Sequence, residues 1–467
     1  MDVNALNQGE SVGIAYSAFS SAGRSRQLGG TTQLWYGQCV PMDAIDFEPR
    51  PWVPYSGWPF PKPVLDPYYG RAEDFFDIRG ATYDTQIWAQ FGLQPPPLEA
   101  AKLHYKPTVW CPKTHMGKVY KGQLAKSTNI AVLIHANVVK INSAANHSRV
   151  DSVSMRALSG VTGRVAAKHY ILCCGGIENA RLLLLSEGLG NGYDTVGRCF
   201  QEHIHACCAR IATHHPKPLQ DTLAMLYPRR GRYLPKMVLS EAVQRRQHTL
   251  NCTANLVFQF EGRSAAAASR NIYLALKQRR RPQQVGKELK IILSHGSDLL
   301  SLLYRRYVLG RSSSAPPSAI WLQPHVEQAP NWDSRIRLSS QRDALGLPLA
   351  QIDWRLSELE RHTAETMVQT LQSVWADGQP AQVQPVEWLR DSARDWRSGF
   401  SSSSHPMGTT RMADNPRQGV VDRNGQVHGV ANLFIAGSSV FPTSGYANPT
   451  LTLVALAIRL GDYLKTI

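Results

Sequence analysis

Residues 401–464 read SSSSHPMGTTRMADNPRQGVVDRNGQVHGVANLFIAGSSVFPTSGYANPTLTLVALAIRLGDYL and form the most informative part of the chain. The apolar run Leu433–Ala436 predicts a strand that ends in a turn at Gly437. Asn448 and Pro449 then predict a helix start, because Asn favours the N-cap and Pro the first helical position. This stretch is therefore predicted to fold as loop, strand, glycine turn and helix.

The predicted helix start and the loop before it hold candidate catalytic groups. The first N–H groups of a helix and its dipole stabilise negative charge, so the start at Pro449 and Thr450 suits an anionic group. His405 titrates near neutral pH and suits acid/base chemistry. Each has an ordinary alternative, since a loop histidine is commonly structural and Asn448 is commonly only a cap. Sequence spacing does not show whether His405 and Asn448 meet.

A second strand, glycine turn and helix is predicted earlier in the chain. Lys168–Gly176, KHYILCCGG, ends in paired glycines and precedes the helical pattern IENARLLLLS. Asn129–Ile141, NIAVLIHANVVKI, predicts another strand, and the Asp-Pro at the start of Asp66–Ile78 predicts a polar helix. Leu28–Phe60 is dense in Gly, Pro and Trp, which indicates ordered loops of the kind that often build sites.

Composition places the chain among globular proteins. Its 467 residues are 43% hydrophobic and 18% charged, which excludes disordered, collagen-like and coiled-coil classes. The 8 cysteines include no Cys-x-x-Cys, so we expect buried reduced thiols and no metal site. The N-terminus has no basic, apolar leader, and no run of about 18 apolar residues occurs. We therefore expect a cytoplasmic location.

The formal net charge is +16, and positive residues gather in the segment 229–311. The ten cations are Arg229, Arg230, Arg232, Lys277, Arg279, Arg280, Arg281, Arg305, Arg306 and Arg311. Between them, leucines and isoleucines recur at helical spacing: Leu289, Ile292, Leu293, Leu299, Leu300, Leu302 and Leu303. Such a helix either lies on an anionic membrane or packs its apolar face on the core. An anionic partner is a further alternative, and we expect no nucleic acid.

Several ordered blocks resemble one family. The blocks are HPMGTTRM, VHGVANLFIAGSSVFPTSGYANPTLTLVALAIRLGDYL, RQLGGTTQLWYG, SGWPF, HYILCCGGIENARLLLLS, TVGRCFQEH and VEQAPNWDSRIRLS. Together they resemble the glucose-methanol-choline (GMC) oxidoreductases, flavoenzymes that oxidise alcohols and sugars. The similarity covers Arg24–Arg210 and Gln323–Ile467.

The resemblance implies a mixed α/β fold. It comprises a Rossmann-like FAD-binding domain, incomplete at its N-terminus, and an antiparallel-sheet substrate domain capped by helices. We expect residues 1–60 to be FAD-domain loops that contact the flavin and 61–210 to interleave both domains. Residues 211–395 are expected to be mainly substrate domain, and 396–467 to be the catalytic and FAD-binding end.

The resemblance also implies roles for single residues. His405 corresponds to the family's catalytic histidine and Asn448 to its partner, so a carbinol hydrogen leaves as hydride to flavin N5 while His405 handles the hydroxyl proton. The implied FAD contacts are Gly29, Gly30, Thr31, Val138, Gly175, Gly437, Ser438, Pro449 and Thr450. Leu34 stands before Trp35 where some relatives attach FAD through histidine, so we expect non-covalent FAD. The substrate is expected to be a small alcohol or sugar, and the electron acceptor stays open.

One departure from the family pattern bears on activity. No Gly-x-Gly-x-x-Gly occurs in the chain, although that turn normally holds the cofactor's pyrophosphate at a helix start. We therefore expect weakened FAD binding and a parallel sheet with exposed apolar edges. The alternatives are a catalytically inactive remnant or partner-binding subunit, and an enzyme like the hydroxynitrile lyases.

Overall fold

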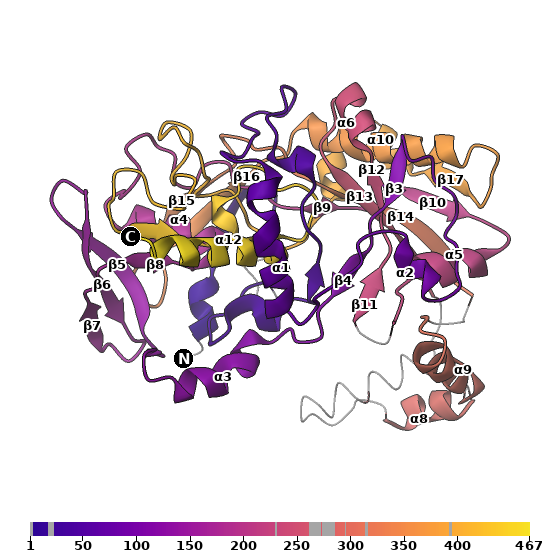
Figure 1. Cartoon of the computed structure of the whole chain (residues 1–467), viewed down its shortest axis with the longest axis horizontal. Coiled ribbons are helices and arrows are strands. Elements are labelled where there is room, and N and C mark those ends of the chain that lie inside the picture. Colours follow the sequence, from indigo (N-terminus) through magenta and orange to yellow (C-terminus); the bar gives the residue numbers. More distant parts are fainter. Residues whose placement is uncertain are drawn as a thin grey trace.

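An antiparallel sheet organises the largest part of the fold (Figure 1). The computed structural model describes residues 3–16, 23–228, 231–260, 272, 285–294, 296–312, 316–391 and 395–467. Within them the sheet runs β17-β10-β14-β13-β12-β3, and β9 joins β14 to β18. Its strands are β3 Leu103–Tyr105, β9 Ile204–His205, β10 Ala209–Ala212, β12 Met237–Leu239, β13 Cys252–Gln259, β14 Ala319–Val326, β17 Gln382–Pro385 and β18 Ser401–Ser402.

Alternation along β14 gives this sheet one apolar and one polar face. Ile320, Leu322 and Val326 are buried, whereas the intervening residues are partly exposed. The helix α10 (Glu358–Val374) contacts β13 and β14 and starts with a capping box between Ser357 and Glu360. One face is therefore closed by packing and the other is left for polar residues.

The remaining strands form smaller sheets. β1 (Gly9–Gly13) pairs in parallel with β16 (Pro348–Trp354), and β8 (Tyr170–Leu172) pairs in parallel with β19 (Leu433–Ile435). The other small-sheet strands are β2 Gln38–Cys39, β4 Thr108–Trp110, β5 Asn137–Ser143, β6 Val150–Arg156, β7 Thr162–Val165, β11 Arg232–Leu234 and β15 Arg335–Arg342. The other helices are α1 Asp66–Phe75, α2 Gln86–Ala89, α3 Met116–Lys126, α4 Gly175–Leu185, α5 Pro216–Leu223, α6 Glu241–Gln247, α8 Val285–Ser294, α9 Gly296–Tyr307, α11 Glu387–Arg390 and α12 Pro449–Leu464.

Both predicted strand, glycine and helix units are confirmed. β8 leads into α4 at Gly175, β19 is followed by the turn at Gly437, and α12 begins at Pro449. The predicted helix after Asp66 is also confirmed as α1, which packs on α12, although Leu65 is its N-cap. Mixed α/β architecture with an antiparallel sheet is thus the observed fold class.

Three local predictions are wrong. Residues 129–136 form no strand, and β5 begins only at Asn137, because this apolar run finds no strand partner in the described chain. The side chains of Ile130, Val132, Leu133 and Ile134 are exposed. Five of the free cysteines are buried as expected, but Cys173 and Cys174 are exposed at the end of β8. The alternative that the basic segment packs its apolar face on the core is wrong for Leu289, Leu300 and Leu303. These side chains are exposed on α8 and α9.

Some sequence predictions lie outside the described residues. Arg229, Arg230, Lys277, Arg279, Arg280 and Arg281 are among these, and so are the side chains of Leu293 and Leu299. In the part of the chain that is described, no helix has both the length and the apolar character to cross a membrane.

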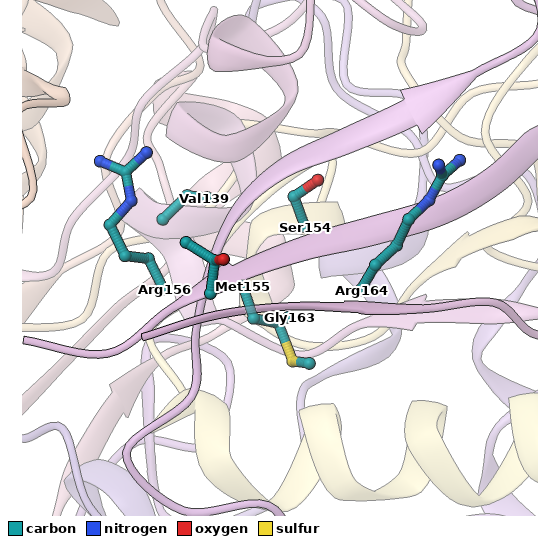
Figure 2. Close-up of a pocket in the computed structure, with 7 residues that line it drawn as sticks. Val139, Ser154, Met155, Arg156, Gly163 and Arg164 are labelled. Carbon is teal, nitrogen blue, oxygen red and sulfur yellow. The ribbon is translucent and has the colours of Figure 1, made fainter. Parts of the chain in front are cut away.

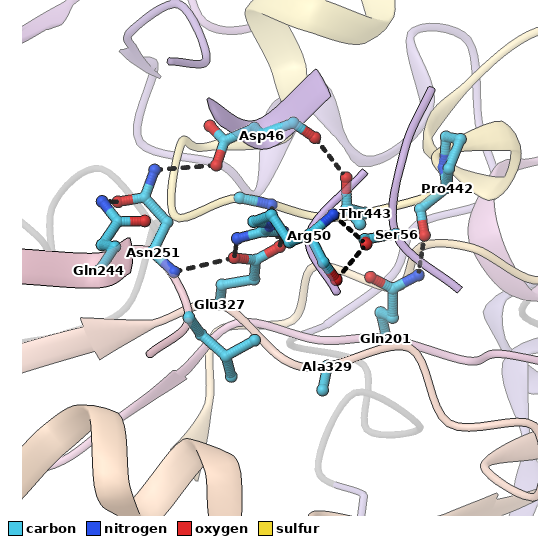
Figure 3. Close-up of polar contacts among 12 residues, drawn as sticks. Asp46, Arg50, Ser56, Gln201, Gln244, Asn251, Glu327, Ala329, Pro442 and Thr443 are labelled. Atoms are coloured by element: carbon cyan, nitrogen blue, oxygen red, sulfur yellow. Dashed lines mark hydrogen bonds and ion pairs between the residues drawn. The ribbon is translucent and has the colours of Figure 1, made fainter. Parts of the chain in front are cut away.

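A buried ion pair joins the end of β14 to the loop that carries Arg50 (Figure 3). Arg50 Nη1 and Nη2 donate to Glu327 Oε2 and Oε1 at 2.8 and 2.6 Å, and both side chains are fully buried. The carboxylate also accepts from the backbone N–H of Asn251 at 2.9 Å and of Gly445 at 3.3 Å. Burial, with the neighbouring Asp43 and Glu327, raises the pKa of Asp46 to about 8. Asp46 is therefore mostly protonated at neutral pH, and the carboxylate paired with Arg50 is that of Glu327.

We expect Arg50→Ala to lower the free energy of unfolding by about 3–5 kcal/mol, because it leaves the Glu327 carboxylate buried without a counter-charge. The double variant Arg50→Met/Glu327→Met should lose less, since it removes both charges. Urea unfolding followed by tryptophan fluorescence measures this. Arg79→Ala, which removes an exposed pair with Asp74, is the control. Equal stability of Arg50→Ala and the control contradicts the prediction.

Candidate active site

One cavity of about 910 Å³ collects nearly all the predicted site residues. Its lining includes His405, Asn448, Gly29, Gly30, Thr31, Val138, Gly175, Ser438, Pro449 and Thr450. Gly437 is the exception: it precedes Ser438 in a turn at φ +124° and does not line the cavity. Residues more than 400 positions apart in sequence therefore meet around one space of a size suited to a cofactor or substrate.

A second cavity of about 460 Å³ lies on the β5–β6–β7 sheet (Figure 2). Val139, Ser154, Met155, Arg156, Thr162, Gly163 and Arg164 line it. It contains none of the predicted site residues, so the larger cavity is the candidate active site.

His405 is held against a second histidine. Its Nδ1 lies 3.1 Å from Nδ1 of His203, and the two rings meet edge to face with centroids 5.2 Å apart. Burial lowers the pKa of His203 to about 4, and burial, His203 and Lys236 lower the pKa of His405 well below its usual range. Both rings are therefore neutral at pH 7, and one Nδ1–H donates to the other Nδ1. Among the described residues, none bonds to Nε2 of His405.

Glu202 fixes the backbone on both sides of this contact. Its Oε1 accepts from the backbone N–H groups of His405 at 2.6 Å and His203 at 2.9 Å. Its Oε2 accepts from the hydroxyl of Tyr16 at 2.9 Å. Burial raises the pKa of Glu202 to about 7 despite these bonds. Glu202 and His203 were not predicted as site residues, although both stand in the block TVGRCFQEH. The adjacent acid and histidine were the signal that could have found them.

Asn448 is more than a helix cap. It occupies the N-cap position of α12, but its side chain makes no capping hydrogen bond. The side chain lines the cavity, and no described residue pairs with its amide. The amide is therefore available to a ligand, beside the positive end of the 16-residue helix α12.

Two close approaches of the backbone require glycine. A side chain at Gly29, which has φ +88°, would overlap Gly117 in α3, and one at Gly176 would overlap the carbonyl of Pro406. The second approach sets the start of α4 against the loop that carries His405. Gly176 is thus a positioning residue, although its place in the sequence indicates a turn residue first.

An ion cluster that sequence analysis missed lines the same cavity. Glu178 pairs with Arg24 and Arg26 at 2.9 Å and with Arg181 at 3.2 Å, and Arg181 also pairs with Asp343 at 2.6 Å. Although burial alone opposes ionisation, Arg26, Arg24 and Arg181 lower the pKa of Glu178 to about 2. The cluster thus has three cations and two carboxylates beside the start of α4.

These features fit an extended anionic cofactor. The starts of α4 and α12 line the same cavity, and each carries a positive dipole end. A side chain at Gly175, which has φ +83°, would meet no atom within 4 Å, so this turn opens on free space. FAD, with its pyrophosphate and a flavin that gains negative charge on reduction, matches this donor set.

Comparisons with known proteins agree with the geometry. Two family models, both described as GMC oxidoreductase, match residues 117–205 and 330–457, which include Gly175, Glu202, His405 and Asn448. The chain belongs to the GMC oxidoreductase family. Proteins of this family are FAD-dependent oxidoreductases that act on CH–OH groups.

The relatives of this GMC protein have low sequence identity to it, but the alignments cover most of the chain. It is 23% identical to paromamine 6'-oxidase of Streptomyces fradiae, over 92% of this chain and 77% of the relative. It is 24% identical to the fructose dehydrogenase large subunit of Gluconobacter japonicus, over 75% of this chain and 57% of the relative. Among solved structures, formate oxidase matches with a TM-score of 0.54 at 15% identity, covering 95% of this chain and 84% of that one. Pyridoxine 4-oxidase matches with a TM-score of 0.55 at 14% identity, covering 95% of this chain and 85% of that one. Both matches support the same fold.

Glu202→Gln should preserve the active-site loop and Glu202→Ala should disrupt it. Gln keeps an oxygen for the two backbone N–H groups, whereas Ala leaves these buried donors unsatisfied, at about 1–3 kcal/mol each. Because the pKa of Glu202 rises from 4.5 to about 7 on folding, wild type should lose unfolding free energy relative to Glu202→Gln as pH rises from 4.5 to 7. Urea unfolding across that range measures both effects. Parallel pH profiles for wild type and Glu202→Gln contradict the shift.

Proposed function

We propose that this chain oxidises a CH–OH group of a small alcohol or sugar, with FAD held in the 910 Å³ cavity. The main observation behind this proposal is that His405 and Asn448 line the same cavity. Nε2 of His405 and the side-chain amide of Asn448 form no hydrogen bond with any described residue. The named activities of paromamine 6'-oxidase and fructose dehydrogenase support alcohols or sugars as the substrate class. FAD, when bound, accepts at N5 the hydride that leaves the carbinol carbon.

His405 is the base in this proposal. The proposal places the proton of His203 on Nε2, the ring nitrogen remote from His405. His203 Nδ1 then accepts the Nδ1–H of His405, so Nε2 of His405 keeps a lone pair. That nitrogen takes the hydroxyl proton of the substrate.

Asn448 orients the substrate oxygen in this proposal. Its amide NH₂ donates to the hydroxyl oxygen, which gains negative charge as the proton leaves. The adjacent start of α12 stabilises negative charge on the same side of the cavity. The residues Gly29, Gly30, Thr31 and Ser438 are proposed to flank the flavin, and the start of α4 with Arg24 and Arg26 to face the phosphates.

The attachment of FAD is proposed to be non-covalent. Leu34 lines the cavity immediately before Trp35, and a hydrocarbon side chain cannot form a histidyl link. Acid precipitation should therefore release the flavin into the supernatant. Flavin that stays with the precipitated protein contradicts this proposal.

Anaerobic flavin reduction tests the catalytic roles. An alcohol or sugar that bleaches the wild-type flavin should bleach it at least 100-fold more slowly in His405→Ala, because the proton acceptor is lost. Asn448→Ala should slow the same step to a smaller extent. Exposed His214→Ala is the control and should behave as wild type. Unchanged bleaching in His405→Ala refutes its role, turnover without bleaching indicates a lyase, and a folded protein that retains no flavin indicates an inactive remnant.

A separate observation supports the proposal of an anionic membrane as partner. Leu300, Leu303, Tyr304, Tyr307 and Val308 form an exposed apolar stripe on and just after α9, at positions i, i+3, i+4, i+7 and i+8. The other side of α9 faces the protein: Arg305 pairs with Asp221, and Arg306 lies 4.0 Å from the centroid of the Tyr227 ring. On α9 the arginines therefore face the protein, and the apolar side chains face solvent.

A bilayer fits this stripe better than a second apolar protein face does. α8 and α9 project from the body (Figure 1), and exposed Lys287 and Lys290 on α8 supply charges that attract anionic headgroups. Tyrosine rings also favour the interface between headgroups and acyl chains. The proposed contact is an α8–α9 pair lying on the surface of an anionic membrane.

Vesicle co-sedimentation tests this contact. Wild type should bind vesicles that contain about one-third anionic phosphatidylserine in phosphatidylcholine. It should not bind vesicles of phosphatidylcholine alone, because these lack the anionic headgroups. Leu300→Ser/Tyr307→Ser should lose the binding, whereas exposed Val161→Ser, at the β6–β7 turn, should retain it. Absent binding overturns the proposal. A dimer in sedimentation velocity that the double variant abolishes would assign the stripe to a second copy.

A further inference from the structure

Two aromatic side chains line the cavity that also holds His405 and Asn448. Tyr36 lies two residues before β2, and Trp110 is the last residue of β4. Their ring centroids are 5.9 Å apart, with the rings tilted by 47°. Trp110 is partly exposed and Tyr36 is 75% exposed, so the ring of Tyr36 is accessible to a ligand in this cavity.

Strand register places an amide beside the two rings. Gln38 on β2 pairs directly with Trp110 on β4, so both side chains lie on one face of the sheet, and Gln38 also lines the cavity. Gln38 Nε2 donates to Thr108 Oγ1 at 2.6 Å, and no described residue donates to Gln38 Oε1. The hydroxyl of Tyr36 likewise has no partner in the described chain. We call Tyr36, Gln38 and Trp110 the aromatic wall; it combines two rings with a free acceptor and a free hydroxyl.

Neighbouring contacts hold the aromatic wall in position. Arg232 on β11 pairs with Trp110 across the strand edge opposite β2, and its guanidinium carbon lies 5.0 Å from the centroid of the Trp110 ring. Such a cation–π contact favours one orientation of the ring. Trp35 anchors the loop before Tyr36, because its Nε1 donates to the carbonyl of Thr114 at 2.8 Å. A wall that is ordered before a ligand arrives loses less entropy on binding.

The aromatic wall is tied to the segment that carries Asn448. β2 contacts α12, whose N-cap is Asn448. Lys106, just before β4, adds a second tie: its Nζ donates to the carbonyl of Pro41 at 2.9 Å and lies 5.8 Å from the centroid of the Tyr446 ring. Pro41 follows Gln38 by three residues, and Tyr446 precedes Asn448 by two. A ligand on the wall can therefore extend toward the catalytic groups within one cavity.

A sugar ring matches the chemistry of this wall. A pyranose carries C–H groups on its faces and hydroxyls around its rim. Its C–H face buries apolar surface against an aromatic ring, while its hydroxyls donate to Gln38 Oε1 and accept from the hydroxyl of Tyr36. A short aliphatic alcohol has no ring face to cover Tyr36 and Trp110. An open-chain polyol loses more conformational freedom when it lies flat on them.

We propose that the aromatic wall binds the pyranose ring of a sugar or glycoside, and that this molecule is the substrate oxidised at His405 and Asn448. The inference rests on the proposed function and narrows its substrate class to cyclic sugars. The flavin is the competing occupant, because its flat ring also stacks on aromatic side chains. The free acceptor of Gln38 and the hydroxyl of Tyr36 favour the sugar, since the face of a flavin ring carries no hydroxyls to pair with them.

The first test measures the thermal stability of the FAD-loaded protein under anaerobic conditions. Methyl glucoside, methyl galactoside or methyl mannoside should stabilise wild type more than sorbitol does at equal concentration, because only the glycosides have a closed ring. Tyr36→Ala and Trp110→Leu should lose that difference, and Trp110→Phe, which keeps a ring, should retain most of it. Tyr193→Ala, an exposed tyrosine that does not line the cavity, is the control and should match wild type.

Two results of this test overturn the proposal. One is an equal shift with sorbitol and with all three glycosides in wild type. The other is a glycoside preference that survives in Tyr36→Ala. Because the Tyr36 side chain is exposed, its removal leaves the fold intact and this variant decides the matter even if Trp110→Leu does not fold.

The second test separates the sugar from the flavin as occupant of the wall. Titration with FAD, followed by flavin fluorescence, should give the same Kd for wild type and Tyr36→Ala. A Kd for FAD that rises in Tyr36→Ala while the glycoside preference stays unchanged assigns the wall to the flavin ring and overturns the proposal.

The third test measures anaerobic flavin reduction by the methyl glycoside that binds best. Trp110→Leu should raise the sugar concentration for half-maximal rate roughly tenfold and change the limiting rate little, because stacking stabilises the ground state and the transition state alike. An unchanged half-maximal concentration contradicts the role of the wall. If no sugar bleaches the wild-type flavin, the proposed oxidation fails, and the stability shifts still decide whether the wall binds sugars.

Discussion

The buried Arg50–Glu327 pair is the constraint on which the site geometry depends. Glu327 directly follows β14, and its carboxylate pairs with Arg50 (Figure 3). It also accepts from the backbone N–H of Gly445, three residues before Asn448. Thr443 adds a second tie through its hydroxyl, which donates to the carbonyl of Asp46 at 2.6 Å. These bonds hold the antiparallel sheet and the start of α12 in one frame. Asn448 and His405 can face the same cavity because the frame fixes both sides of it.

The histidine pair depends on a second constraint of this kind. Two neutral imidazoles 3.1 Å apart share one hydrogen bond, so the tautomer of one ring determines that of the other. Glu202 holds both backbones with a single carboxyl oxygen, and Gly176 lets α4 approach the loop at Pro406. The reactive nitrogen of His405 is thus positioned in part by Glu202 and His203, which do not line the cavity.

Local signals explain what could be predicted from sequence. The starts of α4 and α12 were predictable, because glycine, asparagine and proline act on the backbone next to them. Residues 129–136 were not, because an apolar run becomes a strand only where another strand pairs with it, and none does in the described chain. The contact of His203 with His405 spans 202 positions. Such contacts follow from tertiary structure, so the family resemblance supplied His405 and Asn448 but neither of their neighbours.

The charges around the cavity favour both the removal of a proton and the negative charge that this removal leaves. Burial, His203 and the positive charge of Lys236 lower the pKa of His405, which keeps its ring neutral and able to accept a proton at neutral pH. The helix start at Pro449 favours the negative charge that develops on oxidation.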